Sequence, residues 1–389
     1  MRAPGPVRRL GAAVPAPRGP EAPGWTAEVR RDDAALPALA ADLRDLYRRC
    51  PTATPFQAYE WIRPWWDEYG TPGRLRLATV RRGGRLVAAA PLALVRRAGL
   101  PVLVPLAAPQ SDVTDLLLDP AHADAAAPRL ARALLADSGW AALDLPEVRP
   151  GAAAHRLARH WPGRTWRTPS SVCLDLPDAD VSGVLARLPG RAAGKTRARL
   201  RRIDRRGITV RPAPPDEVPT AVRELLDLHV RQWRGRPLNP EHTRDRFRRH
   251  LAAAAQGLAR DGGAAVLRYH WDGRLVAADL VLLGHGFAGA YLYGAAPDLR
   301  DHVDVGLMLL REDLAVADGR GLSLLRGREP YKLKWRPDPV RHERLVFART
   351  RTAPAYAALT RARAALAARR HAAPRQVAVR RARDRHLPP

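Results

Sequence analysis

The chain has 389 residues, 46% of them hydrophobic, which is enough for one large domain or two domains of ordinary size and argues against global disorder. The two cysteines, Cys50 and Cys173, fit a reducing compartment, although a single disulfide between them stays open. No apolar run approaches the roughly 18 residues of a membrane span, and the N-terminal residues lack the apolar centre of a secretory signal. We therefore expect a soluble cytoplasmic protein.

The formal net charge of +27 is concentrated in two segments. Residues 187–211 hold ten basic side chains and one acidic one, and so do residues 351–389, so that each segment carries a net charge of +9. Clusters of this kind attract phosphate-bearing partners, such as nucleic acid or another polyanion, acyl-CoA, a nucleotide-linked precursor or an anionic lipid. The alternative is a solvated basic face in an arginine-rich protein.

The first half of the chain has the pattern of an α+β unit. Residues 1–24 are rich in Pro, Gly and Ala and are predicted to be disordered. From 25 to 180 the apolar residues follow helical or strand-like periods. The dense aromatic run FQAYEWIRPWW favours a helix that faces the core over a ligand-binding box. The predicted elements are strands at 25–30, 75–81, 86–95, 101–107, 141–145 and 171–176 and helices at 36–50, 56–69 and 128–136.

Helices dominate residues 181–260, and strands return after them. The connecting helices are predicted at 182–207, which carries the first basic segment, at 216–234 and at 246–259. Residues 351–389 are predicted to be an arginine-rich tail. Between them lies a second α+β unit, 261–350, with predicted strands at 264–270, 275–283, 287–293, 322–325 and 343–348 and a helix at 305–317.

A sequence repeat links the two units. The segment ATVRRGGRLVAAAPLALV, at 78–95, is echoed by LRYHWDGRLVAADLVLL, at 267–283. Each is a strand, a turn with Gly-Arg, and a strand that begins LVAA. We therefore predict an α+β fold of two tandem units, each a mainly antiparallel mixed sheet flanked by helices. A chance match of one hairpin is the alternative.

The stretch LLRGREPYKLKW, at 324–335, holds two of only three lysines in a chain with 66 Lys and Arg residues. In this arginine-rich background a lysine is expected where a compact charge with an adjustable pKa is needed. A turn at 327–330 is predicted to present Tyr331 and Lys332. The alternative is two basic residues on an exposed strand edge.

Five stretches, in this order, resemble one protein family: FQAYEWIRPWW, DGRLVAADLVLL, YLYGAAPD, a helix that ends in DGRG, and RGREPYKLKW. Over residues 30–350 the pattern is similar to the CelD-like, or cellulose-biosynthesis-type, branch of the GNAT acyltransferase superfamily. That branch is related to the Fem-type peptidyltransferases, which carry two GNAT units in tandem. The resemblance implies an N-acyltransferase that moves an acetyl or other acyl group from acyl-CoA to an amine, with no metal.

The resemblance also implies a site for the acyl donor. In GNAT folds the pantetheine arm of acetyl-CoA pairs with a splayed strand, here 287–293, and the pyrophosphate lies at the start of the next helix, here 301–306. Three acids, Asp298, Asp301 and Asp304, depart from the family pattern because they would repel a pyrophosphate; for Asp304, a helix N-cap is the alternative. The donor contacts implied are Tyr291, Tyr293, Arg300, His302, Gly306 and Leu307.

The same resemblance assigns catalytic roles near the Tyr-Lys pair. Lys332 would stabilise the developing oxyanion, and Tyr331 would protonate the leaving group. Two carboxylates are candidates for the general base: Asp279, which interrupts an apolar strand, and Glu329, which adjoins the pair. A paired or capped acid is the alternative for each.

Substrate contacts are implied for Asp112 and Asp115, at the equivalent edge of the first unit. They are also implied for Trp65 and Trp233, for which packing is the alternative. The acceptor would be a small-molecule or glycan amine, such as a cell-envelope or polysaccharide precursor. Two other functions stay open: a Fem-like transferase that uses aminoacyl-tRNA, which would engage both basic segments, and a non-catalytic GNAT-like binding module.

Overall fold

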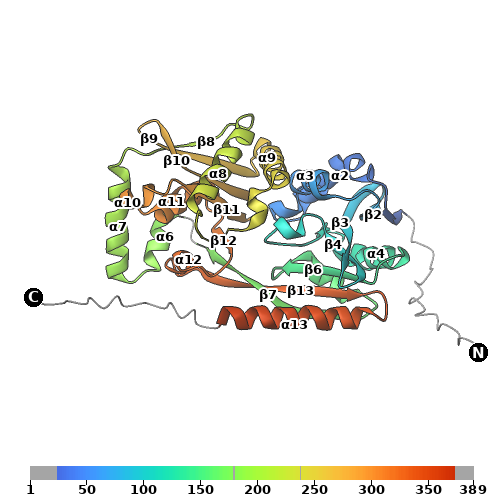
Figure 1. The fold of residues 1–389 in the computed structure, drawn as a ribbon. Helices are drawn as coiled ribbons and strands as arrows, with labels where there is room; N and C mark the ends of the chain where they lie inside the picture. Colours follow the sequence, from blue (N-terminus) through green and yellow to red (C-terminus); the bar gives the residue numbers. More distant parts are fainter. Residues whose placement is uncertain (1–23, 178–179, 237, 373–389) are drawn as a thin grey trace, which may run out of the picture.

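A computed structural model of the chain describes residues 24–177, 180–236 and 238–372, so the predicted disordered segment lies outside the described residues apart from Gly24. Within them a single sheet runs through the molecule in the order β1-β2-β3-β4-β6-β13-β7-β12-β11-β10-β9-β8, with β5 beside β3 (Figure 1). Its strands are β1 (Trp25–Arg30), β2 (Leu75–Arg82), β3 (Arg85–Arg97), β4 (Leu100–Pro105), β5 (Leu117–Leu118), β6 (Ala142–Val148), β7 (Thr165–Leu176), β8 (Thr209–Pro212), β9 (Ala264–Trp271), β10 (Arg274–Gly284), β11 (Phe287–Ala295), β12 (Leu322–Arg326) and β13 (Asp338–Ala348).

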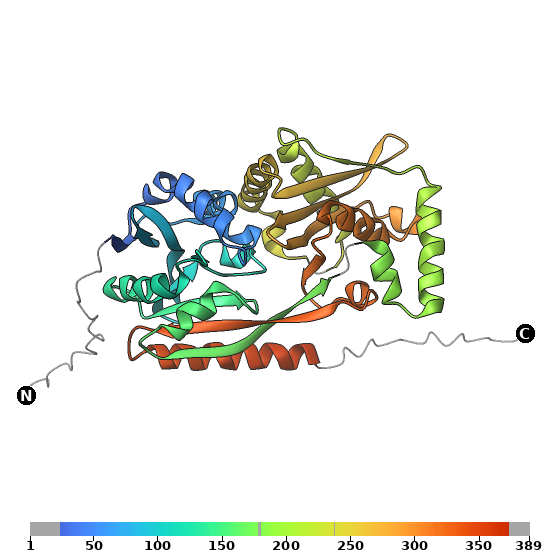
Figure 2. The ribbon, with the colours of Figure 1, turned by 180° about the vertical axis from the view of Figure 1, so that it is seen from behind.

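Helices flank both halves of this sheet, and the last one lies along β7 and β13 (Figures 1 and 2). The α-helices are α1 (Ala35–Ala38), α2 (Ala40–Arg49), α3 (Tyr59–Tyr69), α4 (Ala123–Ala136), α5 (Ala153–Arg159), α6 (Val181–Ala186), α7 (Gly190–Asp204), α8 (Val218–Gln232), α9 (Asp245–Arg260), α10 (Leu299–His302), α11 (Val305–Ala317), α12 (Pro330–Leu333) and α13 (Ala353–Ala372).

The two halves of the sheet repeat one pairing pattern, which confirms the predicted α+β fold of two tandem units. From β1 inward, three antiparallel pairs are followed by one parallel pair, β4 with β6. From β8 inward, three antiparallel pairs are again followed by one parallel pair, β11 with β12. The hairpin noticed in the sequence is therefore one part of a longer structural repeat.

Two long strands at the centre belong to both units. The C-terminal strand β13 lies between β6 and β7, although β6 is far away in the sequence. In turn, the end of β7 pairs with β12 of the second unit. Each half of the chain thus completes its part of the sheet with a strand from the other half.

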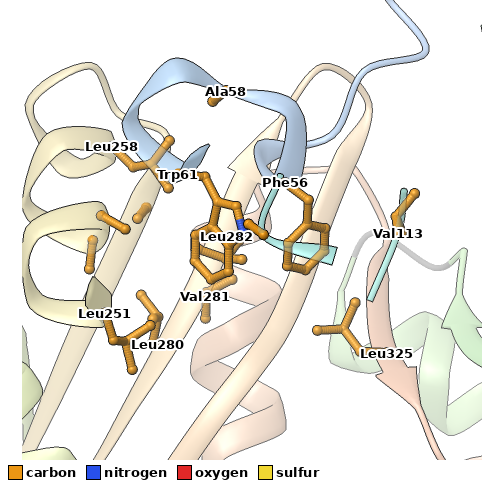
Figure 3. Close-up of a cluster of buried hydrophobic side chains, with 14 of the residues drawn as sticks. Phe56, Ala58, Trp61, Val113, Leu251, Leu258, Leu280, Val281, Leu282 and Leu325 are labelled. Atoms are coloured by element: carbon orange, nitrogen blue, oxygen red, sulfur yellow. The ribbon is translucent and has the colours of Figure 1, made fainter. Parts of the chain in front are cut away.

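The hydrophobic core is continuous across the boundary between the units. Phe56 and Trp61 come from the first half and pack against β10 and α9 of the second half (Figure 3). The ring of Trp61 lies edge-on to that of Tyr291 on β11, with 5.2 Å between ring centroids. This packing confirms that the aromatic run is core-facing, and a second cluster lies between α4 and the sheet of the first half.

Three local features differ from the sequence-based prediction. The basic helix expected at 182–207 is interrupted between α6 and α7, where Pro189 disfavours a helical conformation for the residue before it. The turn predicted at 327–330 is irregular backbone over 327–329, and Pro330 already begins the short helix α12, which carries Tyr331 and Lys332. Much of the tail forms α13, whose Tyr356 hydroxyl donates to the buried Asp144 carboxylate at 2.5 Å.

Candidate functional site

A pocket opens where the two innermost strands of the second unit separate. β11 and β12 are paired only at Gly289 and Ser323, so the rest of β11 turns an unpaired edge toward the gap. On the other side, Leu325 has a left-handed φ of 58°, a costly conformation for a bulky residue, at the irregularity where β12 leaves its register with β7. The pocket has a volume of about 180 Å³, in the size range of cavities that hold a benzene-sized group.

The pocket brings together eight of the residues singled out in the sequence and leaves six outside its lining. The wall is built by the connecting helix α8 and by β10, β11, α11, β12 and α12 of the second unit, together with one residue of the first unit. The lining includes Asp112, Trp233, Asp279, Tyr291, Tyr293, Gly306, Tyr331 and Lys332, whereas Trp65, Asp115, Arg300, His302, Leu307 and Glu329 are not part of it.

Lys332 is held at the pocket by two contacts. It is only 9% exposed, and its Nζ donates to the carbonyl of Arg326 at 2.7 Å and lies 3.1 Å from a carboxylate oxygen of Glu329. Gly327 makes this arrangement possible, because its φ is 111° and the Glu329 carboxylate occupies the space that a Cβ would need. Tyr331, 41% exposed, reaches the ring of Tyr293 edge-on.

Two buried acids form another part of the wall. Asp279 of β10 and Asp313 of α11 are 3% and 5% exposed, and neither Oδ1 accepts a hydrogen bond from an N–H or O–H group of the described residues. The Tyr269 hydroxyl donates to Oδ2 of Asp279 at 3.1 Å. Burial raises the pKa of Asp279 to about 7, and burial beside Asp279 holds the pKa of Asp313 well above its usual range. The pair therefore retains a proton near neutral pH.

His229 of α8 is part of the pocket lining and forms a pair with His242. The Nδ1 of His229 lies 2.7 Å from the carbonyl of Tyr293, which can only accept, so this nitrogen carries the proton. Its Nε2 then accepts from Nδ1 of His242 at 3.1 Å. Burial lowers the pKa of His229 and brings that of His242 to about 4. With both ring nitrogens engaged, His229 positions β11 and has no free nitrogen to act as a base.

An ion-pair network joins the two units at the edge of the pocket. Arg326, at the end of β12, contacts Asp112 of the first unit through its Nε at 2.5 Å and through its backbone N–H at 3.3 Å. Its Nη1 lies 3.6 Å from Glu147, which accepts hydrogen bonds from Ser170 and Ser171. Asp112 is thus already partnered by a cation.

The N-terminus of α11 is occupied by its own side chain. Asp304 caps the helix by accepting from the N–H of Leu307 at 3.1 Å, and it is ion-paired with Lys334 at 3.0 Å and with Arg199 at 3.1 Å. A pyrophosphate bound here would have to replace the carboxylate. The N–H groups at this helix end are therefore not open to an anion as the structure stands.

The other predicted contacts have local partners. Arg300 donates to the carbonyl of Pro297 at 2.8 Å, and the His302 ring packs edge-on against Trp271. Asp115 accepts three backbone hydrogen bonds, two of them from the first residues of α5, and burial nevertheless raises its pKa to about 6. Trp65 donates to Gln110 at 2.6 Å. Their functional roles stay predictions.

Two charged residues of the pocket wall, Asp313 and Arg326, were not predicted from the sequence. Asp313 occupies a position on the apolar stripe of α11, between Leu310 and Leu314, and an acid on such a stripe is a recognisable signal. Arg326 gives no such signal, because one arginine among so many is inconspicuous and its partner Asp112 is distant in the sequence.

Among the described residues, no group of His, Cys, Asp and Glu has the arrangement of a metal site, and no helix is long and apolar enough to cross a membrane.

Comparison with known proteins supports the GNAT superfamily. Residues 191–333 match the family model described as an acetyltransferase (GNAT) domain. The crystal structure of FemX is similar, with a TM-score of 0.58 and 11% identity over 79% of this chain and 96% of that one. So is the C-terminal domain of a putative lysylphosphatidylglycerol synthetase from Agrobacterium fabrum, with a TM-score of 0.51 and 14% identity over 84% of this chain and 96% of that one. No curated protein matches the sequence. At these identities the likeness concerns the fold.

Proposed function

We propose that the chain is an N-acyltransferase of the CelD-like branch that moves an acyl group from acyl-CoA to an amine. The observation that carries the proposal is the buried Lys332 in the wall of the pocket beside the unpaired edge of β11. A cation fixed there, away from bulk water, stabilises negative charge far better than one in solvent. The acceptor we propose is a small-molecule or glycan amine, such as a cell-envelope or polysaccharide precursor.

The chemistry needs little from the protein beyond position and charge. The neutral amine attacks the thioester carbon, a C–N bond forms, the C–S bond breaks, and the amine gives up one proton while the thiolate takes one. We assign Lys332 to the oxyanion and Tyr331 to the leaving thiol. Of the two candidate bases, Glu329 is already paired with Lys332, whereas Asp279 lines the pocket and receives the amine proton when no other cation is bound to it; when a cation is bound there, the amine proton goes to solvent.

A donor screen tests this proposal. The full chain is incubated with a series of acyl-CoA thioesters and amines, and release of CoA thiol is followed. Lys332→Ala is expected to lower turnover by about 10²–10³-fold, the usual cost of removing an oxyanion donor. Arg48→Ala, which removes an exposed cation of α2, is the control and is expected to leave turnover unchanged. Unchanged turnover in Lys332→Ala would remove the role assigned to this lysine.

One observation favours a second candidate function, transfer from aminoacyl-tRNA. Asp304 fills the helix N-terminus that a CoA pyrophosphate would use, and the neighbouring α7 exposes a row of cations. An RNA backbone would match that row without needing the α11 N-terminus. This row comprises Arg191, Lys195, Arg197, Arg199, Arg201 and Arg202.

Salt dependence separates the two donors. If tRNA is the donor, the affinity of the chain for charged tRNA falls steeply as salt is raised, and Arg197→Ala with Arg201→Ala lessens the slope by about one phosphate contact each. Release of CoA thiol in the acyl-CoA assay, together with weak and equal binding of tRNA and other polyanions, would exclude it.

A further inference from the structure

The charges of the pocket wall do not balance. Its lining holds three carboxyl groups, Asp112, Asp279 and Asp313, and two permanent cations, Arg326 and Lys332. Both cations are already engaged, Arg326 with Asp112 and Lys332 with Glu329 and a backbone carbonyl. The paired acids of β10 and α11 therefore have no protein cation as a partner among the described residues.

The acid pair is buried deeply enough for this imbalance to matter. Buried carboxyl groups are normally hydrogen-bonded to donors or paired with a cation, because losing their hydration is costly. Here the two acids share one proton and Tyr269 supplies one hydrogen bond to Asp279, but no other side chain or backbone N–H of the described residues donates to Oδ1 of either acid. The other acid close to the pair, Glu312, is ion-paired with Arg311 at 2.7 Å.

The rest of the pocket is suited to an aliphatic chain. Its lining includes Leu280, Leu309 and Leu310, together with the tyrosines of β11 and α12. A space of about 180 Å³ accommodates a chain of a few methylene groups with one polar end. Among the described residues of the wall, the buried polar atoms without a hydrogen-bond partner are Oδ1 of each acid and the indole N–H of Trp233, and of these only the acids can accept a hydrogen bond from a cation.

We propose that Asp279 and Asp313 bind the ammonium group of a short aliphatic arm that enters this pocket. The arm belongs either to the acyl group of the donor or to the acceptor amine, and only this choice rests on the proposed function. An ammonium has three donors and one positive charge, which match two carboxylates with free oxygen positions. Its arrival favours ionisation of both acids, so the proton that they share leaves to solvent.

Small amines test the site without any turnover. The full chain is titrated at pH 7 with 1-aminopentane and with its isostere pentan-1-ol, by thermal unfolding and by calorimetry in phosphate and in Tris buffer. The amine is expected to raise the Tm, and its binding enthalpy is expected to differ between the buffers because a proton is released. Equal stabilisation by amine and alcohol, or an enthalpy independent of the buffer, would overturn the proposal.

Variants locate the effect. Asp313→Asn and Asp279→Asn keep the shape of the side chain, and each is expected to weaken binding of 1-aminopentane at least tenfold and to abolish the proton release. The matched control is Asp318→Asn, an exposed acid at the C-cap of the same helix in a left-handed conformation that asparagine tolerates. Unchanged binding in Asp313→Asn, measured in a variant with native-like thermal unfolding, refutes the assignment.

Two further ligands identify the molecule that carries the arm. If the arm belongs to the donor, 5-aminopentanoyl-CoA binds more tightly than pentanoyl-CoA, and this preference is lost in Asp313→Asn. If it belongs to the acceptor, 1,5-diaminopentane binds more tightly than 1-aminopentane, with the same loss. Amine binding without acyl transfer would refute the proposed function alone, and acyl transfer without selective amine binding would refute this inference alone.

Discussion

The confined surroundings of Lys332 favour a lysine over an arginine at this position, even in an arginine-rich chain. Lys332 directs its ammonium at one carbonyl oxygen and one carboxylate, in a space that leaves 9% of the residue exposed. A guanidinium is larger and planar, and its donors are arranged for a two-oxygen partner. The compact point charge of lysine fits this position, and one of its three N–H donors remains for a ligand.

Lys332→Arg is therefore expected to behave as a damaging substitution. We expect turnover in the thiol-release assay to fall at least tenfold although the positive charge is retained, because the longer group is forced away from Arg326 O. The change is measured as kcat and KM, and thermal unfolding checks the fold. Activity of Lys332→Arg close to that of the wild type would mean that charge alone is required at this position.

A buried histidine on α9 makes a prediction about acid stability. His250 is fully buried, both of its ring nitrogens lack hydrogen-bond partners among the described residues, and burial lowers its pKa to about 3. The folded protein therefore holds it neutral, while the unfolded chain takes up a proton below about pH 6.5. Its contribution to stability is complete above that pH and is lost as the pH falls toward the folded value, by about 2 kcal/mol at pH 5.

His250→Phe is expected to lessen this acid sensitivity. The aromatic ring keeps the edge contact with Trp61, where the ring centroids are 5.0 Å apart, but it cannot take up a proton. The difference in unfolding free energy between pH 7.5 and pH 5, measured in urea, should be smaller by about 2 kcal/mol than in the wild type. The remaining sensitivity includes His229 and His242, whose pKa values are also lowered. An unchanged difference would mean that His250 is protonated equally in both states.

The local sequence pattern predicted where helices and strands lie, but it did not predict how the strands pair. The hairpin strands expected at 75–81 and 86–95 are β2 and β3 within two residues, because a Gly-Gly turn and alternating apolar residues leave few alternatives. The helix expected at 305–317 is α11, with the Asp304 cap at its start. By contrast, the separation of β11 from β12 gives no signal in the sequence. These two strands pair at a single position, and the gap between them creates the pocket. The splayed strand was predicted only from the family resemblance.

The cap of α11 provides a test of the donor at this scale. Asp304→Asn keeps a side-chain oxygen for the N–H of Leu307 but removes the negative charge and frees Arg199 and Lys334. If CoA is the donor, its affinity should rise about five- to tenfold, since the pyrophosphate then meets cations instead of a carboxylate. Affinity is measured by calorimetry, with the uncharged pantetheine arm as a control that should not respond. No gain for CoA would favour a donor that does not use this helix N-terminus.

For the whole molecule, the exchange of strands is the feature that the sequence concealed. The repeat in the sequence correctly indicated two units, but it gave no reason to place β13 between β6 and β7. Pairing between distant segments is decided by which edges remain open after each half has formed, and a single sequence does not display those edges. For the same reason the contact between Arg326 and Asp112, which joins the units at the pocket, was not predictable.

Because β7 and β13 complete both units, the chain should unfold as one cooperative body. Phe347 of β13 is fully buried in the core of the first unit and contacts Trp161, so Phe347→Ala is expected to cost about 3–5 kcal/mol. Two buried thiols report on the two units in urea: native Cys50, and a cysteine introduced by Ala277→Cys on β10. Peptide mass spectrometry after thiol labelling should give one midpoint for both sites, lowered equally by Phe347→Ala. A lower midpoint for Cys50 alone would show that the second unit stays folded without its shared strand and that the two halves are independent domains.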